Sequence, residues 1–194
     1  DGIMPYTSSG VLSLGADIRY ASEGGLYFEA GTNLAGLAMT GSQWNEAGVR
    51  GIVDRLYLSG GWRMLHLVVG MKPRVRELGY LSVTAGNLIY TANTRNMPGV
   101  NAWSDWIYFE KGHWFGIRGN FAHYQTVDNR WVKGTMIHNK SFAFKVALGR
   151  KVDFEAGLDH WAHWGGTSPT AGVRPSSFKD YLKIILARRG GSDA

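Results

Sequence analysis

The stretch FAFKVALGRKVDFEAGL, residues 142–158, holds two runs in which apolar residues alternate with others. In 142–148 the phenylalanines, the valine and the leucine occupy every second position, and Lys145 lies between them. In 152–158 apolar residues again occupy every second position, with two carboxylates between them. Because successive side chains of a strand point to opposite faces, each run predicts a β-strand with one apolar and one polar face. The short connection at 149–151 predicts that these strands form an antiparallel hairpin.

The same alternation recurs along most of the chain. Similar runs lie at 12–20, 65–71, 115–121 and 178–186, and further strands are expected at 26–38, 52–60, 80–90 and 103–110. Together these segments predict an all-β protein of about ten strands without a helix.

Composition agrees with this prediction and excludes several other classes. The 194 residues suffice for one domain, and we treat 1–194 as a single domain. The 27 Gly and the 13% aromatic residues favour strands, tight turns and aromatic belts. The chain has no Cys, which excludes disulfides and thiolate chemistry. The net charge of +6 comes from scattered basic residues, which argues against a nucleic-acid partner but suits an acidic polymer or lipopolysaccharide phosphate.

The chain carries no helical membrane signal. It has no run of about 18 apolar residues, so no transmembrane helix is predicted. Residues 1–10 lack the basic and apolar regions of a signal peptide. Since the chain also ends directly after a strand-like run, we expect a mature piece or a fragment of a longer β-barrel.

Two all-β architectures fit the alternation. A soluble sandwich buries its apolar face, whereas an outer-membrane barrel turns that face to lipid and its polar face to the lumen. The barrel is favoured by strands near the 9–11 residues that cross a bilayer, by alternating short and long connections, and by charges within strands. Aromatic residues at strand ends also resemble the belts at membrane interfaces. These are Trp103, Trp106, Tyr108, Trp114, Phe115, Tyr124, Trp161 and Trp164.

The alternation of connection lengths fails once, at 73–102. KPRVREL and TANTRNMPGVN both resemble long connections, so either a strand is miscounted or one segment folds into the barrel. The best candidate for an inward segment is NTRNMPG, residues 93–99, although an ordinary loop explains it equally well. If it folds inward, we expect Arg95 to point into the lumen and to pair with an acidic sugar.

Several rare-residue strings follow one another along the chain. They are GNLIYTANTRNMPG (86–99), WIYFEKG (106–112), GNFAHYQ (119–125), VKGTMIHNKSFAFKVAL (132–148) and LDHWAHWGGTSP (158–169), and the first half adds MPYTSSGVLSLGA and RLYLSGGWRMLHLVVGMKPR. In these strings the chain resembles the capsule-assembly Wzi family of outer-membrane barrels.

The resemblance implies a non-enzymatic protein in the outer membrane of a Gram-negative bacterium. Its partners would be capsular or other surface polysaccharide, outer-membrane lipid and lipopolysaccharide. Family members are longer than this chain, so the resemblance also implies further strands in the same barrel or from another chain.

The string HWAHW, residues 160–164, raises the question of a metal site. His160 and His163 are three residues apart, so on a strand they face opposite sides and cannot share one metal ion. His160 and Trp164 continue the apolar face, whereas Asp159, Trp161 and His163 continue the polar face. We interpret this end of the strand as interfacial packing at a rim, with sugar contact as the alternative.

Asp153 and Glu155 form the second candidate site. Two carboxylates on one face suggest glycoside hydrolysis. Charged residues are also the ordinary lining of a wet lumen, where Arg118 or Lys145 would neutralise them, and we favour this interpretation. The sequence contains no nucleophile elbow or phosphate-binding loop in a suitable context.

Three functions stay open at this point. The first is a barrel that engages surface polysaccharide, the second a porin-like channel without a dedicated ligand, and the third a soluble β-sandwich lectin. No catalytic residue, metal ligand or cofactor is expected. The expected saccharide contacts are Arg95, Arg118, Lys145, Asp159, Trp161, His163 and Trp164.

Overall fold

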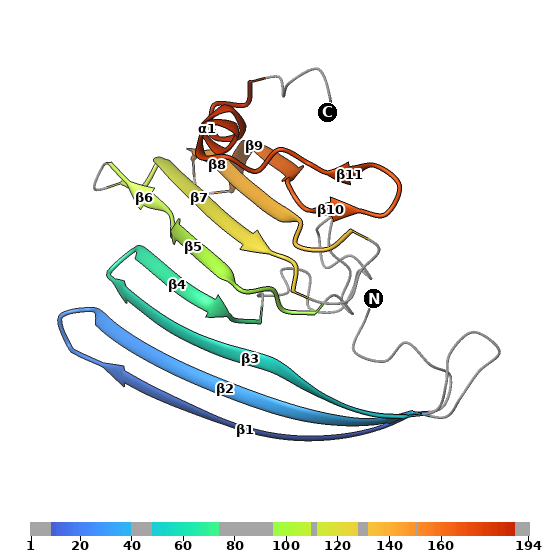
Figure 1. Ribbon diagram of the computed structural model, residues 1–194. Coiled ribbons are helices and arrows are strands. Elements are labelled where there is room, and N and C mark those ends of the chain that lie inside the picture. The colour runs from blue at the N-terminus through green and yellow to red at the C-terminus, as the bar shows by residue number, and fades with distance from the viewer. Residues whose placement is uncertain are drawn as a thin grey trace.

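The computed structural model describes residues 9–39, 48–73, 95–109, 112–127, 132–149 and 151–188. These residues form a nine-stranded antiparallel sheet, a separate two-stranded pair and one helix (Figure 1). The strands of the large sheet are β1 (Ser9–Ala21), β2 (Leu26–Met39), β3 (Gly48–Trp62), β4 (Leu65–Met71), β5 (Gly99–Ser104), β6 (Ile107–Tyr108), β7 (Phe115–Gln125), β8 (Met136–Leu148) and β9 (Val152–Trp164). The pair is β10 (Thr167–Ser168) and β11 (Gly172–Val173), and the helix is α1 (Phe178–Ile185).

The expected antiparallel all-β fold is confirmed. The main strands follow one another in the order β1-β2-β3-β4-β5-β7-β8-β9, and β6 pairs with β7. Within the described residues β1 and β9 are the two edge strands and do not pair with each other, so this part of the sheet is open. The strand expected at 103–110 is interrupted, because β5 ends at Ser104 and β6 begins at Ile107. The strand expected at 80–90 lies outside the described residues.

The strand expected at 178–186 is wrong, because this segment forms α1. The Ser177 hydroxyl accepts a hydrogen bond from the backbone N–H of Asp180, and the Asp180 carboxylate accepts one from the backbone N–H of Ser177. This capping box satisfies N–H groups that a helix start otherwise leaves without partners. Apolar residues then recur at the helical spacing of three and four: Phe178, Tyr181, Leu182 and Ile185.

The register of the sheet separates the side chains into two faces. Leu14 on β1 pairs with Leu34 on β2, and Leu34 pairs with Val53 on β3, so the three residues share one face. The same rule places Phe142 and Leu158 together on β8 and β9. The apolar face carries Leu12, Leu14, Ile18, Phe28, Leu34, Leu56, Leu58, Leu67, Phe121, Phe142, Phe144, Val146, Leu148, Phe154 and Leu158. The polar face carries Asp17, Glu29, Tyr57, His66, Arg118, Asn120, Asn139, Lys145, Asp153, Glu155, Asp159, Trp161 and His163.

Exposure differs between the faces in the opposite sense to a soluble protein. On the apolar face Leu12 is 83% exposed and Leu158 is 82% exposed. On the polar face Tyr57 and Ser59 are each 5% exposed, and Asn139 is 6% exposed. The polar face is therefore the sheltered one.

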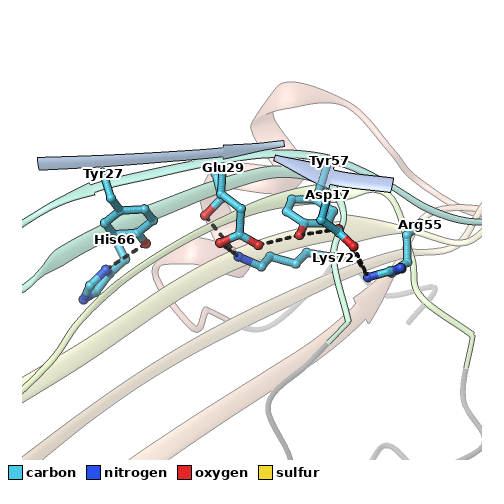
Figure 2. A network of polar contacts seen from close by, with 8 residues as sticks. Asp17, Tyr27, Glu29, Arg55, Tyr57, His66 and Lys72 are labelled. Carbon is cyan, nitrogen blue, oxygen red and sulfur yellow. Dashed lines mark hydrogen bonds and ion pairs between the residues drawn. The ribbon is translucent and has the colours of Figure 1, made fainter. Parts of the chain in front are cut away.

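The sheet is curled (Figure 1), and Asp17, Glu29 and Tyr57 of the sheltered face point to the inside of this curl (Figure 2). The segment 95–98 crosses this side: Asn96 donates a hydrogen bond of 2.9 Å to the Asp54 carbonyl in β3, and Met97 packs against Ile137 in β8. Three strands separate β3 from β8 in the sheet order. The described part of NTRNMPG thus folds inward, as one of the two interpretations of this loop predicted.

Helix α1 packs on the opposite, apolar face at one end of β7, β8 and β9. The ring of Tyr181 stacks on Trp164 at 5.6 Å between centroids and meets the edges of His123 and His138. The Lys140 ammonium donates to the carbonyl of Ile185 in the last turn of the helix. Among the described residues no helix is long and apolar enough to cross a membrane.

Candidate functional site

The polar face of β1, β2 and β3 carries a cluster centred on Tyr57 (Figure 2). Tyr57 Oη lies 3.1 Å from Asp17 Oδ1 and 2.5 Å from Glu29 Oε1, so its proton can be donated to either carboxylate. Arg55 Nη1 lies 3.3 Å from the Asp17 carboxylate, and Lys72 Nζ lies 3.0 Å from Glu29 Oε2. One hydroxyl therefore links two carboxylates, each of which also has a cation.

Gly31 makes this close approach possible. In the register of the sheet it lies between Asp17 on β1 and Tyr57 on β3. A Cβ at Gly31 would lie 2.2 Å from Asp17 Oδ1 and 2.6 Å from the Tyr57 ring. Because this position has no side chain, residues from two strands that are not neighbours meet above the strand between them.

A second cluster continues the polar face across β2, β4 and β5. Tyr27 Oη lies 3.0 Å from His66 Nδ1, and His66 Nε2 lies 2.9 Å from Asp105 Oδ2. The His66 ring also stacks on Trp103, with 5.0 Å between centroids. Gly61 separates Tyr27 from His66 in the register, and a Cβ there would lie 2.4 Å from the Tyr27 ring. The same arrangement therefore occurs twice. At Gly31 and again at Gly61, a glycine on the middle strand allows side chains of the two flanking strands to form a hydrogen bond above it.

A third cluster lies on the polar face of β7, β8 and β9. Arg118 Nη2 lies 2.7 Å from Glu155 Oε1, and Lys145 Nζ lies 2.9 Å from Asp153 Oδ2. Both cations also approach the ring of Trp106, at 4.8 Å and 5.9 Å from its centroid. The prediction that these cations neutralise the two carboxylates is confirmed. Each carboxylate of this pair thus has its own cationic partner.

A fourth group of contacts runs along β7, β8 and β9 towards the end that carries α1. Asn120 Nδ2 donates to Asn139 Oδ1 at 2.5 Å, and Asn139 Nδ2 donates to Asp159 Oδ1 at 2.6 Å. The indole N–H of Trp161 donates to Asp159 Oδ2 at 2.7 Å. The half-buried Trp161 ring packs against the cluster that Met97 of the inward segment forms with Ile137. These contacts hold an indole, two amides and a carboxylate in fixed positions, which suits hydrogen bonding to a ligand rich in hydroxyl groups.

The structure brings most of the expected saccharide contacts to one face but separates one of them. The residues on the polar face are Arg118, Lys145, Asp159, Trp161 and His163. Arg95 is partly exposed at the start of the segment that crosses this face. Trp164 lies on the apolar face beneath α1 and is 9% exposed, so it cannot share a ligand with Trp161 inside the curl.

The two histidines of HWAHW lie on opposite faces, as predicted. His160 pairs with Lys140 on the apolar face, and His163 pairs with Ile137 on the polar face. Within the described ranges no group of three or more His, Asp or Glu side chains is placed to hold a metal ion. Trp164, expected as an exposed belt residue, is instead covered by Tyr181.

The clusters of β1 to β5 were not identified from the sequence. Tyr27 and Glu29, like Arg55 and Tyr57, are two residues apart, which places each pair on one face of its strand. The tight turn at 22–25 sets the register of the first hairpin, and that register aligns Asp17 with Gly31. Combining alternation with the hairpin register would have located the Tyr57 cluster.

Comparisons with known proteins add no further information on the site. No family model, curated protein or solved structure matches this chain.

Proposed function

We propose that this chain forms part of an outer-membrane β-barrel that holds or exports capsular polysaccharide. In this proposal the apolar face meets lipid and the polar face lines the lumen. The observation that carries the proposal is the reversed exposure of the two faces, with large apolar side chains exposed and the Tyr57 cluster sheltered. A soluble protein rarely exposes apolar surface continuously over so many strands.

Strand length supports a membrane-spanning role. β1, β2 and β3 contain 13, 14 and 15 residues, which exceeds the 9–11 that cross a bilayer. A sandwich would need a second large sheet against the apolar face. Among the described residues the only other sheet is the pair β10–β11, so the soluble lectin is the less favoured alternative.

The polysaccharide is inferred from the resemblance to the Wzi family, and the chemistry of the polar face supports it. Sugar rings stack on indoles through their C–H faces, and their hydroxyls bond to amides and carboxylates. Trp161, Asn139 and Asp159 offer such groups side by side. Arg118 and Lys145 already have carboxylate partners, so we expect hydroxyl and ring contacts to contribute more than charge.

The membrane role is tested with spin labels on neighbouring positions of β8. Phe142 and Ser141 lie on opposite faces, and the chain has no Cys to interfere with labelling. We expect the label at Phe142→Cys to be accessible to oxygen dissolved in lipid. The matched label at Ser141→Cys should instead be accessible to a water-soluble nickel chelate. If both labels report water or a closed protein core, the barrel is excluded.

The polysaccharide role is tested in cells that carry the capsule. Trp161→Ala combined with Arg95→Ala should shift capsule from the cell-associated to the released fraction. The shift should be modest, because an extended polymer is held by many weak contacts. Trp62→Ala is the matched control, since Trp62 is an exposed indole on the apolar face. If the double variant folds normally, as judged by heat-modifiable gel mobility, and retains all its capsule, a channel without a dedicated ligand becomes the better proposal.

A further inference from the structure

Helix α1 covers a polar interruption in the apolar face. Toward the end of β7, β8 and β9 the face carries His123, His138, Lys140 and His160 in place of aliphatic residues. His138 is fully buried beside Tyr181, and Lys140 donates to the C-terminal turn of the helix. The helix therefore lies where the apolar face stops being apolar, which for a lipid-facing sheet is the level of the headgroups.

The helix does not bury all of its own apolar residues. Tyr181 packs on the sheet, but Phe178 is 74% exposed, Leu182 is 44% exposed and Leu186 is 61% exposed. Each of these three residues is four positions from the next, so they form one stripe along the helix. At the Phe178 end of this stripe an open groove of about 480 Å³ lies between the helix and the sheet, and Phe121, His123, Trp164 and Tyr181 are among its lining residues.

Cations accompany the exposed apolar stripe. Lys179 and Lys183 are also four positions apart and follow the stripe residues by one position, so they lie along its edge. Arg174 and Arg188 add positive charge before and after the helix, and Asp180 is the single carboxylate in residues 174–188. The Lys183–Asp180 contact, 3.7 Å long and partly exposed, neutralises little of this charge.

We infer that α1 is an interfacial helix that binds the anionic headgroups of the membrane. The stripe of Phe178, Leu182 and Leu186 enters the region where headgroups meet acyl chains, and the lysines pair with lipid phosphate. Apolar residues beside cations are the pattern of helices that lie in a membrane surface. This inference rests on the proposed contact between the apolar face and lipid. It adds that the protein prefers anionic lipids and that the α1 end of the sheet lies at the level of the headgroups.

The test uses the full chain in vesicles of phosphatidylcholine, with or without phosphatidylglycerol. Spin labels are placed at Leu182→Cys or Phe178→Cys on the stripe and at Lys179→Cys beside it. In the anionic vesicles we expect the stripe labels to favour oxygen over the nickel chelate and the Lys179 label to show the reverse. Replacing Lys179 and Lys183 with Gln should lower the equilibrium constant for binding of the helix to the anionic vesicles by about thirtyfold and leave it unchanged in phosphatidylcholine.

The outcomes separate this inference from the proposed function. If Phe142→Cys reports lipid while both stripe labels report water, the interfacial helix is excluded and the barrel stands. If the stripe labels enter lipid equally with and without phosphatidylglycerol, the recognition of anionic headgroups is excluded. If Phe142→Cys also reports water, the barrel itself fails.

Discussion

The apolar face of β1 to β4 differs from the apolar face of β7 to β9. Over the first region the described residues place no charged side chain on this face, and each of the four strands contributes a leucine to it: Leu14, Leu34, Leu58 and Leu67. Over the second region histidines and Lys140 interrupt the face, and α1 covers the interruption. Charged and imidazole groups are therefore present on this face where the helix gives Lys140 a partner and places Tyr181 against His123 and His138.

The helix lies where Lys140 needs a hydrogen-bond partner on the apolar face. If the apolar face meets lipid as proposed, Lys140 on an uncovered part of it would have no partner, and an unpaired charge in lipid is costly. The carbonyl of Ile185 accepts a hydrogen bond from Lys140, and a cation is also favourable at a helix C-terminus. Lys140 and the last turn of the helix thus satisfy each other's polar groups.

A lysine on the uncovered region should have the largest effect. Leu58 is 67% exposed on the apolar face of β3. We expect Leu58→Lys to lower the free energy of unfolding from bilayers by about 2–4 kcal/mol, because the ammonium would meet hydrocarbon without a carbonyl partner. Denaturant titration followed by heat-modifiable mobility measures this loss. Leu58→Met is the matched control and should cost less than about 1.5 kcal/mol. A tolerated lysine would show that this region is not in lipid.

The polar face can be disturbed separately from the apolar face at Gly31. Its new Cβ in Gly31→Ala would collide with Asp17 and Tyr57, so their hydrogen bond must lengthen or break. We expect a loss of about 1–3 kcal/mol in the free energy of unfolding. Gly36→Ala on the same strand is the control, because the nearest atom to its Cβ would be the Leu12 carbonyl oxygen at 4.0 Å. Equal effects of the two substitutions would mean that the Tyr57 cluster contributes nothing specific.

Tyr181 makes three ring contacts between the helix and the sheet. Tyr181→Ala removes the stacking on Trp164 and the edge contacts with two histidines, contacts worth about 0.5–1.5 kcal/mol each. We expect faster proteolysis within 174–188 while the sheet keeps its heat-modifiable mobility. Tyr181→Phe keeps the ring and should restore protection. If the alanine variant is as resistant as the parent, Tyr181 does not hold the helix on the sheet.

The sheet could be predicted from the sequence because alternation is a local signal. Lys145 between Phe144 and Val146 is enough to define two faces, and the register confirms this division along β8 and β9. The two faces also predicted which residues of HWAHW lie together. The neutralisation of Asp153 and Glu155 followed from the same division, because Arg118 and Lys145 lie on the polar face with them.

The helix and the Tyr57 cluster needed information that alternation does not carry. Residues 178–186 alternate incompletely, as an imperfect strand would, and the capping box at Ser177, which distinguishes the helix, lies outside that pattern. The interruption at 105–106 within the expected strand 103–110 has no periodic signal either. The bond between Tyr57 and Asp17 depends on a glycine on a third strand, so it requires the register of two hairpins at once.

The smallest expected effect concerns pH and the start of α1. Hydrogen bonds from the Ser177 hydroxyl and backbone, together with nearby Lys183, hold the pKa of Asp180 below its usual range. A carboxyl whose pKa is lower in the folded state stabilises that state above its unfolded pKa, near 3.9, and the contribution is lost as the pH falls through the folded pKa. Acidification from pH 6 to below about pH 4 should therefore loosen the first turn of the helix and increase the mobility of a spin label at Leu182→Cys.

Asp180→Asn is the control for this effect. The amide oxygen still accepts hydrogen bonds from Ser177 but has no charge to lose, so the label mobility should not change over this pH range. A label at Phe142→Cys in the middle of β8 should also be insensitive, because the sheet does not depend on this cap. If Asp180→Asn leaves the pH response of the Leu182 label intact, the response arises beneath the helix, among the histidines that interrupt the apolar face, and the contrast between the two regions would then extend to their behaviour in acid.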